Sequence, residues 1–571
     1  MAFDRSSVKG LPEGAQIQVI KEVPYVYFRY SWKDESGKIK YARDYLGIVE
    51  NGVFVPNDYY LRVRPTKSKR PSERWSATTR KETAIKAVST TKEAAETPLE
   101  ELELQTKSIG VTALAMSIIR ATGMVDDVKA VLGDDTKNIA NILNLAIAAA
   151  ITAKPTYLSA DESRVQMFIG GQECLTSPRA SELHKRIGAN LDLSARISQQ
   201  RISHLSHQPL LALDGSRLDC NSSNILEAAV GRRKDGTFGS QINFSLLVDA
   251  TTGSPVGYRY YSGVTNDIST LEDFVNIWNA YGLLAKDPML VVDRGYYSQE
   301  ALIKLGLQGY RFLAGAKTGF KIVKSIIDEY NSEFYEASSL LKHNDLYGHQ
   351  SKTQLIGQAG KIDVSVNVFR NPVEEMNETR RFMDALARFE AAWLAGKADP
   401  QDKLLEFYKN PKPNKPLERD EFLVDIECYS LGYFAFVTNT NLPLEDSLEV
   451  YKLRNEAEVV FKLMMGNLLR STRAHSTQAL DGLLFTTFIA LGILTNLRLR
   501  MRADFRGTRL GSQFSIAELI ASLKKIQVVT IQGKSYLINV TSKDKAIAEV
   551  LGFPGLFDSA ESAMKPLMDP L

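Results

Sequence analysis

PLLALD at residues 209–214 and MLVVD at residues 289–293 are short apolar runs that each end in an aspartate. Runs of this length bounded by turn residues predict buried strands. A glycine lies within two residues of each aspartate, and we interpret these glycines as letting the backbone leave the strand beside the acid. The sequence therefore predicts that two strands bring Asp214 and Asp293 to one open edge of a sheet.

The segments between and after these runs complete a mixed sheet. Between the runs, the patterns predict a hairpin of Ile242–Asp249 with Val256–Tyr261 and a helix at Leu271–Leu284. After the second run, they predict a helix from Gln299 onward and a strand at Tyr310–Ala316. With the two aspartate runs, the order is strand, strand, strand, helix, strand, helix, strand. This is the order of an RNase H-like fold, so we predict a multi-domain α/β protein with a mixed catalytic sheet.

At 571 residues the chain is too long for a single core. The N-terminal third is divided into a small β-hairpin module (1–60), a basic and polar linker (61–106) and a helical region (107–205). The rest is divided into the first part of the core (206–317), a β-rich insertion (318–445), the second part of the core (446–510) and a helix–hairpin–helix tail (511–571).

Several strands and helices are predicted within these parts. We predict strands at 25–32, 39–49, 352–356, 362–370, 423–429 and 433–438, and helices at 374–394, 446–470, 482–494 and 543–551. The apolar helix at 482–494 is too short to span a bilayer and is expected to be buried. Residues 178–204 are compatible with a DNA-binding helix-turn-helix or with two ordinary core helices.

The charge distribution favours a nucleic-acid partner more than the net charge of +3 does. Between Arg62 and Lys81 eight basic residues accompany one acid, and between Arg498 and Arg509 five arginines accompany one acid. Two such runs on either side of a carboxylate site favour contact with a phosphate backbone. Three separated cysteines match no metal spacing, and no signal peptide opens the chain, so we expect a cytoplasmic protein.

A third acid is predicted on the helix after the insertion. Two-metal phosphoryl transfer needs carboxylates converging on ions about 3.5–4 Å apart. In YKLRNEAEVVFK (451–462), Tyr451, Arg454 and Glu458 lie at offsets 0, 3 and 7 and share one helical face, whereas Glu456 lies on another. The alternative is that Arg454 and Glu458 form a surface ion pair.

These residues resemble bacterial insertion-sequence DDE transposases of the IS-four superfamily. The resemblance rests on LDGSR around Asp214, VVDRGYYS around Asp293 and the Tyr-x₂-Arg-x₃-Glu spacing, and it extends over about residues 200–555. It implies that Asp214, Asp293 and Glu458 are catalytic and hold two Mg²⁺ or Mn²⁺ ions. It also implies DNA contacts from a set of five residues, Tyr451, Arg454, Lys462, Arg470 and Arg294.

One position departs from the family pattern. A lysine is expected seven residues after the glutamate, but residue 465 is Met. Lys462 and Arg470 are nearby and are the candidates for contacting the same phosphate. Two further acids, Asp219 and Asp249, are interpreted as non-catalytic. Five of the six histidines, His204, His207, His343, His349 and His475, show no zinc-like grouping.

The resemblance implies cut-and-paste transposition. The steps are hydrolysis at the transposon end, attack of the freed 3′-OH on the opposite strand to form a hairpin, hairpin opening, and strand transfer. The implied partners are double-stranded DNA with terminal inverted repeats, target DNA, and a second copy of the chain in a synaptic complex, with no membrane. Two alternatives stay open: a DNA-binding protein of this fold that does not transpose, and a nuclease without strand transfer.

Overall fold

The computed structural model describes residues 8–20, 23–33, 39–50, 52–57, 60, 104–156, 165–190, 192–220, 222–232, 237–265, 267–341, 345–413, 415–469, 472, 474–504 and 515–571. The chain divides into two compact units, Met1–Glu101 and Leu102–Leu571, and each is described by itself. The basic run Arg62–Lys81 lies outside the described residues.

The first unit contains a four-stranded antiparallel sheet. Its strands run in the order β1-β2-β3-β4, with bounds Gln16–Ile20, Val23–Lys33, Ile39–Glu50 and Val53–Pro56. One face packs a small core around Val26, Phe28 and Leu46. The predicted strands at 25–32 and 39–49 are confirmed.

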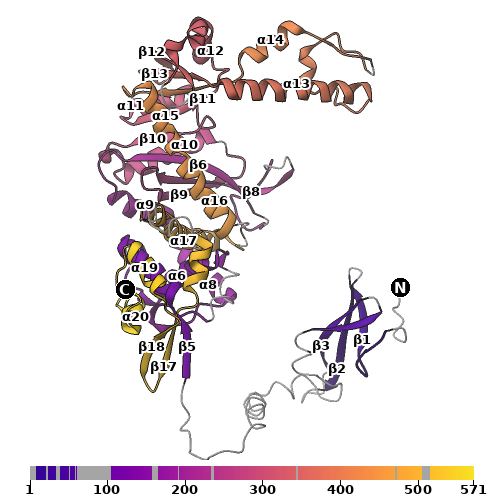
Figure 1. Ribbon diagram of the computed structural model, residues 1–571, viewed down its shortest axis with the longest axis vertical. Coiled ribbons are helices and arrows are strands. Elements are labelled where there is room, and N and C mark those ends of the chain that lie inside the picture. Colours follow the sequence, from indigo (N-terminus) through magenta and orange to yellow (C-terminus); the bar gives the residue numbers. More distant parts are fainter. Residues whose placement is uncertain are drawn as a thin grey trace, which may run out of the picture. The chain divides into compact units, whose positions relative to one another are not determined.

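The second unit is built on a nine-stranded mixed sheet (Figure 1). Its first part contains β6 Leu210–Asp219, β7 Ala229–Arg232, β8 Phe238–Asp249, β9 Ser254–Ser262, α10 Asp267–Ala280, β10 Met289–Val292, α11 Gln299–Leu307 and β11 Arg311–Ala316. The strands β6, β10 and β11 are parallel, whereas β8 is antiparallel to both β6 and β9. The predicted mixed α/β order is confirmed, with β7 as an additional short strand.

Residues 318–445 extend the same sheet. After α12 Lys321–Glu329, the antiparallel strands β12 Tyr347–Gly357, β13 Gly360–Arg370 and β16 Tyr433–Thr438 continue it from β11 in the order β11-β16-β13-β12. Short 3₁₀ turns at Asn331–Tyr335 and Ala337–Ser339 lie between α12 and β12, and another at Leu284–Lys286 lies between α10 and β10. The predicted strands at 352–356, 362–370 and 433–438 therefore belong to the central sheet.

A mainly helical segment with its own core interrupts these strands. It contains α13 Pro372–Leu394, a 3₁₀ turn at Lys403–Phe407, the two-residue strands β14 Tyr408–Lys409 and β15 Glu418–Arg419, and α14 Glu421–Tyr429. It extends away from the sheet (Figure 1). The strand predicted at 423–429 is wrong. Val424 and Cys428 are four residues apart, so a helix turns both toward the core of Phe389 and Phe407.

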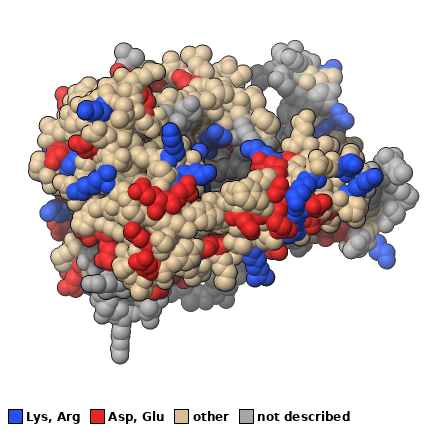
Figure 2. Space-filling model, turned by 90° about the horizontal axis from the view of Figure 1, so that it is seen from above, with Lys and Arg blue, Asp and Glu red and all other residues tan. Residues whose placement is uncertain are grey.

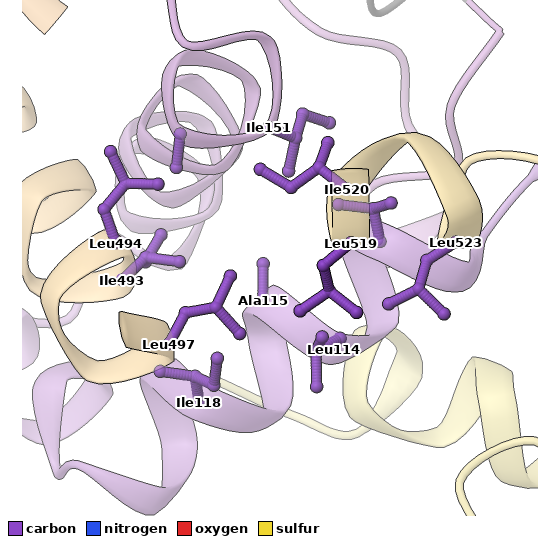
Figure 3. Close-up of a pocket in the computed structure, with 12 residues that line it drawn as sticks. Leu114, Ala115, Ile118, Ile151, Ile493, Leu494, Leu497, Leu519, Ile520 and Leu523 are labelled. Atoms are coloured by element: carbon purple, nitrogen blue, oxygen red, sulfur yellow. The ribbon is translucent and has the colours of Figure 1, made fainter. Parts of the chain in front are cut away.

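The helices from both ends of this unit surround one long buried helix. They are α4 Gly110–Ala121, α5 Met124–Leu132, α6 Thr136–Thr152, α8 Ser177–Gly188, α9 Leu193–Ser203, α18 Ile516–Leu523, α19 Ser542–Val550 and α20 Ala560–Met568, with a 3₁₀ turn at Ile169–Gly171. Side chains of α4, α6, α17 and α18 line one apolar void of about 10 Å³ (Figure 3). The strand β5 Leu104–Ser108 pairs with β17 Gln527–Ile531, which pairs with β18 Lys534–Ile538. The predicted linker therefore ends in a strand.

The central helix is α17, Thr477–Asp504. By length and composition it could cross a membrane, but 83% of its apolar window is buried inside the protein. The prediction of a buried helix is confirmed, although the helix is longer than 482–494. The helix α8 packs on α17 where Gly188 meets Gln478 and where Gly482 meets His184, with backbone so close that a Cβ at either glycine would overlap it. Residues 178–204 form α8 and α9, and both helices contribute buried residues to the main core. Of the two alternatives for this segment, this favours two ordinary core helices over a DNA-binding helix-turn-helix.

Candidate active site

Asp214 lies in the middle of β6. The prediction that the strand ends at Asp214 is wrong, because β6 stays paired with the antiparallel strand β8 as far as Asp219. The neighbour on the other side is shorter: β10 ends at Val292, opposite Leu213. Asp214 is therefore one residue beyond the last parallel pair, where the sheet opens on that side. The adjacent Gly215 remains in the β6–β8 ladder and does not turn the chain.

The environment of Asp214 disfavours its charge. Burial raises the pKa of its carboxyl to about 6, while a hydrogen bond from the Gly215 amide (2.9 Å) and the charge of Arg454 act in the opposite direction. The charges of Asp293 and Glu458 raise the pKa further. All three predicted acids therefore interact electrostatically at one place in the fold.

Asp293 follows β10 directly, as predicted. Its Oδ1 accepts a hydrogen bond of 2.8 Å from the Arg294 amide and one of 3.1 Å from the Tyr451 hydroxyl. Because Val292 pairs with Leu213, the next residues on the two parallel strands are Asp293 and Asp214. The sheet register thus brings two acids that are far apart in sequence to the same edge.

The third acid comes from a helix that is interrupted. The single helix predicted at 446–470 is wrong: α15 Leu444–Leu453 ends before Arg454, α16 Asn455–Leu463 begins after it, and a π-helical turn follows at Met464–Leu468. Arg454 keeps right-handed helical angles (φ −55°, ψ −29°). The direction of the chain therefore changes little, and the residues predicted to share one face still reach one site.

Arg454 joins the acids. Its Nη2 donates to Glu458 Oε1 at 2.5 Å, and its Nη1 lies 3.9 Å from Asp293 Oδ2. Only 8% of Arg454 is exposed. Burial by itself lowers the pKa of this guanidinium, but Tyr451, Asp293, Glu458 and Asp214 raise it above its ordinary value. The positive charge of Arg454 therefore lies beside Glu458 and Asp293 and is favoured electrostatically by all three carboxylates.

Tyr451 is fixed from two sides. Its ring stacks on Phe436 of β16, with centroids 4.1 Å apart and planes at 24°. A Cβ added at Gly315 of β11 would lie 2.7 Å from the Tyr451 hydroxyl and 3.0 Å from the Arg294 nitrogen. The absence of a side chain at residue 315 therefore makes room for the contact between Tyr451 and Asp293.

The family model described as "Transposase DDE domain" matches residues 206–493, just over half of the 571 residues. The chain belongs to this family. Among solved structures, this DDE transposase is similar to a piggyBac transposase synaptic complex with hairpin DNA, determined by cryo-EM. The identity is 9% and the TM-score 0.37, over 74% of this chain and 82% of that one. No protein of curated function matches the sequence.

DDE transposase domains generally use divalent metal ions. In the part of the chain that the structure describes, no three His, Cys, Asp or Glu side chains form a group close enough to hold a metal. At the site, the guanidinium of Arg454 lies close to Asp293 and Glu458. The donor chemistry nevertheless fits a hard divalent cation, because all three side chains offer carboxylate oxygens, Asp214 interacts electrostatically with Asp293 and Glu458, and the side chains of Asp293 and Glu458 are 38% and 39% exposed. Asp214, Asp293 and Glu458 are the residues that would hold it.

The predicted DNA contacts lie in different surroundings. Arg294 lines a groove of about 610 Å³ together with Asp293, Tyr451, Arg454 and a basic residue that the sequence did not single out, Lys317. Lys462 is exposed on α16, and Met465 lies half-buried in the π-helical turn. Arg470 lies outside the described residues. Seen from the end that carries α13 and α14, basic and acidic side chains are interspersed (Figure 2).

The arginines at the end of α17 are engaged within the protein. Arg498 and Arg502 bind the two carboxylate oxygens of Glu456 at 2.6 and 2.7 Å, and Arg500 donates to the Leu551 carbonyl at 2.8 Å. Glu456 does lie on a different face of α16 from Glu458, as predicted. The arginines of Arg498–Arg502, predicted to contribute to a phosphate-binding surface, instead make contacts that fix α16 and the tail to α17.

The residues interpreted as non-catalytic have structural partners. Asp249 accepts hydrogen bonds from the Thr251 and Thr252 amides in the β8–β9 turn, and the Asp219 carbonyl accepts from Thr472. His204 pairs with Asp127, His349 with Glu333, and His475 lies 3.4 Å from the Ser181 hydroxyl. His343 lies outside the described residues, and the three cysteines are free.

The supporting residues around the acids were not predicted. Phe436 belongs to a correctly predicted strand, but the alternation of YFAFVT does not say which element its ring will meet. Gly315 appears in the sequence only as an ordinary strand residue. Both acquire their role through the pairing of β11 with β16, which joins segments more than a hundred residues apart.

Proposed function

We propose that this DDE transposase performs cut-and-paste transposition of a bacterial insertion sequence of the IS-four superfamily, using an RNase H-like core. The observation that carries the proposal is the convergence of Asp214, Asp293 and Glu458 from β6, the end of β10 and α16. The strand order β9-β8-β6-β10-β11 supports the RNase H-like assignment, because it places the first core strand, β6, in the middle of the sheet.

The chemistry of the site is phosphoryl transfer on DNA. Two divalent ions, Mg²⁺ or Mn²⁺, bound by the three carboxylates would lower the pKa of an attacking water and offset the negative charge of the reacting phosphate. Asp293 is held in position by the Tyr451 hydroxyl and the Arg294 amide. Glu458 is held by Arg454. These contacts fix the orientation of two of the acids before DNA arrives.

Tyr451 and Arg454 also lie where a DNA strand would approach, since both line the groove beside Asp293. Arg454 can donate to a phosphate through its planar guanidinium, and Tyr451 can stack on a base or donate to a phosphate. In this proposal they hold a sharply bent DNA end while the freed 3′-OH attacks the opposite strand. The pair between Arg454 and Glu458 equally supports the alternative that Arg454 only orients the acid.

The partners follow from the same reaction. The enzyme would act on double-stranded DNA with terminal inverted repeats and on target DNA, as a homodimer in the synaptic complex, in the cytoplasm near the nucleoid. The remaining predicted contacts, Lys462, Arg470 and Arg294, would hold the backbone around the cleaved phosphate. The helical region before residue 205 and the basic run Arg62–Lys81 would contribute to binding the transposon end.

Single alanine variants at Asp214, Asp293 and Glu458 test this function. Each is expected to abolish cleavage of a duplex carrying the inverted repeats that flank the gene, while DNA binding stays near the wild-type level, because phosphate contacts by Lys and Arg supply most of the affinity. Glu449→Gln is the matched control, since this acid of α15 is exposed and pairs with Lys452. Normal cleavage by Glu458→Ala would refute the assignment of the third acid.

A joining assay separates the proposed activity from the two alternatives. A transposase joins paired cleaved ends to a target plasmid in a manner that depends on all three acids. A nuclease of the same fold cleaves without joining, and a DNA-binding protein does neither.

A further inference from the structure

The outward face of the N-terminal sheet carries alternating tyrosines and arginines. Along β2, Val26, Phe28 and Tyr30 are at most 5% exposed and enter the core, so the residues between them point to the opposite side. Those residues are Tyr25, Tyr27 and Arg29, and the register places Tyr45 opposite Tyr27 and Arg43 opposite Arg29. One side of this sheet is therefore an ordinary core, and the other is aromatic and basic.

The outward side chains form an ordered surface. The Arg43 guanidinium lies 5.0 Å from the centre of the Tyr27 ring and donates to Gln18 Oε1 of β1 at 2.9 Å. The rings of Tyr25 and Tyr45 are 5.5 Å apart. These contacts cross all three strands β1, β2 and β3 and hold the planar groups over the sheet.

The charge on this face has one sign over its centre. Arg29 and Arg43 are directly opposite one another, which places two guanidinium groups side by side on this face. The acid of β3 near them, Asp44, points the other way: it is 8% exposed and accepts a hydrogen bond from Tyr30 in the core. Glu50, the other acid of β3 in the described residues, lies at the far end of that strand beside Val53.

We propose that this face, formed by Gln18, Tyr25, Tyr27, Arg29, Arg43 and Tyr45, binds double-stranded DNA, with the β2–β3 pair entering the major groove. The choice of DNA as the partner rests on the proposed function, whereas this part of the chain had no role predicted from its sequence. A major groove about 12 Å wide admits a two-stranded β-ribbon. Arginine and glutamine side chains can donate to base edges and phosphates, and the tyrosines supply rigid area and hydroxyl donors.

Two further observations favour an anionic duplex over a protein partner. The face presents Arg29 and Arg43 at its centre, and two cations there complement a phosphate backbone. The exposed valines on the same side, Val23, Val53 and Val55, lie toward one end of the strands. In the sequence, the sheet is also followed within a few residues of its last strand by the run Arg62–Lys81, with eight basic residues and one acid. A duplex held by the sheet can be contacted by the adjoining residues of the same chain.

The test uses the full-length protein with Arg43→Gln, Tyr27→Ala and Tyr45→Ala, singly and combined. The probes are a duplex carrying the inverted repeats that flank the gene and a scrambled duplex, measured by fluorescence anisotropy over a range of salt. Loss of Arg43 is expected to weaken binding about tenfold and to reduce the slope of log K against log salt by about one. Arg43→Lys keeps the charge and is expected to retain the salt slope while losing discrimination between the two probes.

Controls separate this inference from the proposed activity. Arg381→Ala removes an exposed arginine of α13, and Tyr536→Ala a half-exposed tyrosine of β18, so both match the tested changes outside the face. If Asp293→Ala still cleaves DNA while the Arg43 variants lose DNA binding, the proposed catalytic function is refuted and the DNA-binding role of this face is supported. Unchanged DNA affinity in the combined variant, with circular dichroism like that of the wild type, overturns the inference. A change of molecular mass in light scattering at unchanged DNA affinity also overturns it, because the face would then be a protein interface.

Discussion

The carboxyl of Asp214 should destabilise the metal-free protein at neutral pH. Its ordinary pKa of 3.8 is raised to about 6 in the folded chain. A rise of about two pKa units corresponds to about 3 kcal/mol of lost stability once the group is ionised in both states. Asp214→Asn removes this cost, and the amide oxygen can still accept the hydrogen bond from the Gly215 amide.

The pH dependence identifies the cause. Below the ordinary pKa the carboxyl is protonated in both the folded and the unfolded chain and costs nothing. As pH rises from 3.8 through about 6, the unfolded chain releases the proton first, so the stability of the wild type falls, and the full cost is present above about pH 6. The advantage of Asp214→Asn should therefore be largest near pH 8 and roughly half as large near pH 5.

The assay is the midpoint of thermal unfolding in EDTA across this pH range. Asp249→Asn is the matched control, because that side chain accepts hydrogen bonds in an exposed turn and asparagine can replace it. Adding Mg²⁺ near pH 8 should raise the midpoint of the wild type and leave Asp214→Asn almost unchanged, since a bound cation offsets the cost of burying the charged carboxylate. An equal effect of Asp214→Asn at every pH, or none at all, would show that burial does not raise the pKa of this carboxyl.

Three further changes test the surroundings of the acids. Arg454→Ala is expected to nick DNA measurably yet to form and resolve hairpins poorly on denaturing gels of end-labelled substrate, and equal losses at every step would show that Arg454 only orients Glu458. Gly315→Ala should lower cleavage severalfold without changing the free energy of unfolding by more than about 1 kcal/mol, because its Cβ meets the Tyr451 hydroxyl at 2.7 Å; adding Tyr451→Phe should recover part of the lost cleavage. Gly482→Ala should destabilise the second unit by about 3 kcal/mol in urea unfolding, because its Cβ would lie 2.1 Å from the His184 carbonyl oxygen; an unchanged midpoint would contradict the close packing of α8 on α17.

The parts of the fold that could be predicted from the sequence are those set by local pattern. The aspartate runs, the hairpin between them and the strand at 433–438 are marked by short apolar stretches and turn residues, and all appear in the structure. The strand predicted at 423–429 failed because EFLVDIECY is a short apolar run, which periodicity does not distinguish from a helix. Its outcome depends on the core formed with Phe389 and Phe407, which the local sequence does not contain.

The candidate site could likewise be predicted from the sequence only in part. The acids could be singled out because their flanking residues form motifs, but the packing around them depends on long-range register. The length of β6 beyond Asp214 is set by its pairing with β8. The role of the helices before residue 205 was also not evident from their own pattern. They share a core with α17, so a truncation at residue 205 would expose that core, and removing only residues 1–101 is the appropriate deletion for measuring end-specific binding.

The two glutamates of α16 show how the outer helices support the edge of the sheet where we propose that catalysis occurs. Glu458 contacts Arg454 beside the other acids, while Glu456 turns to the opposite side and binds Arg498 and Arg502 of α17. The helix α17 is in turn packed against α6, α8 and α9 from the N-terminal half of the unit. A catalytic carboxylate must be held within about 0.5 Å of its working position. In this transposase α16 gains such support from α17 through Glu456, two residues from Glu458, and so from helices that lie outside the sheet carrying the two aspartates.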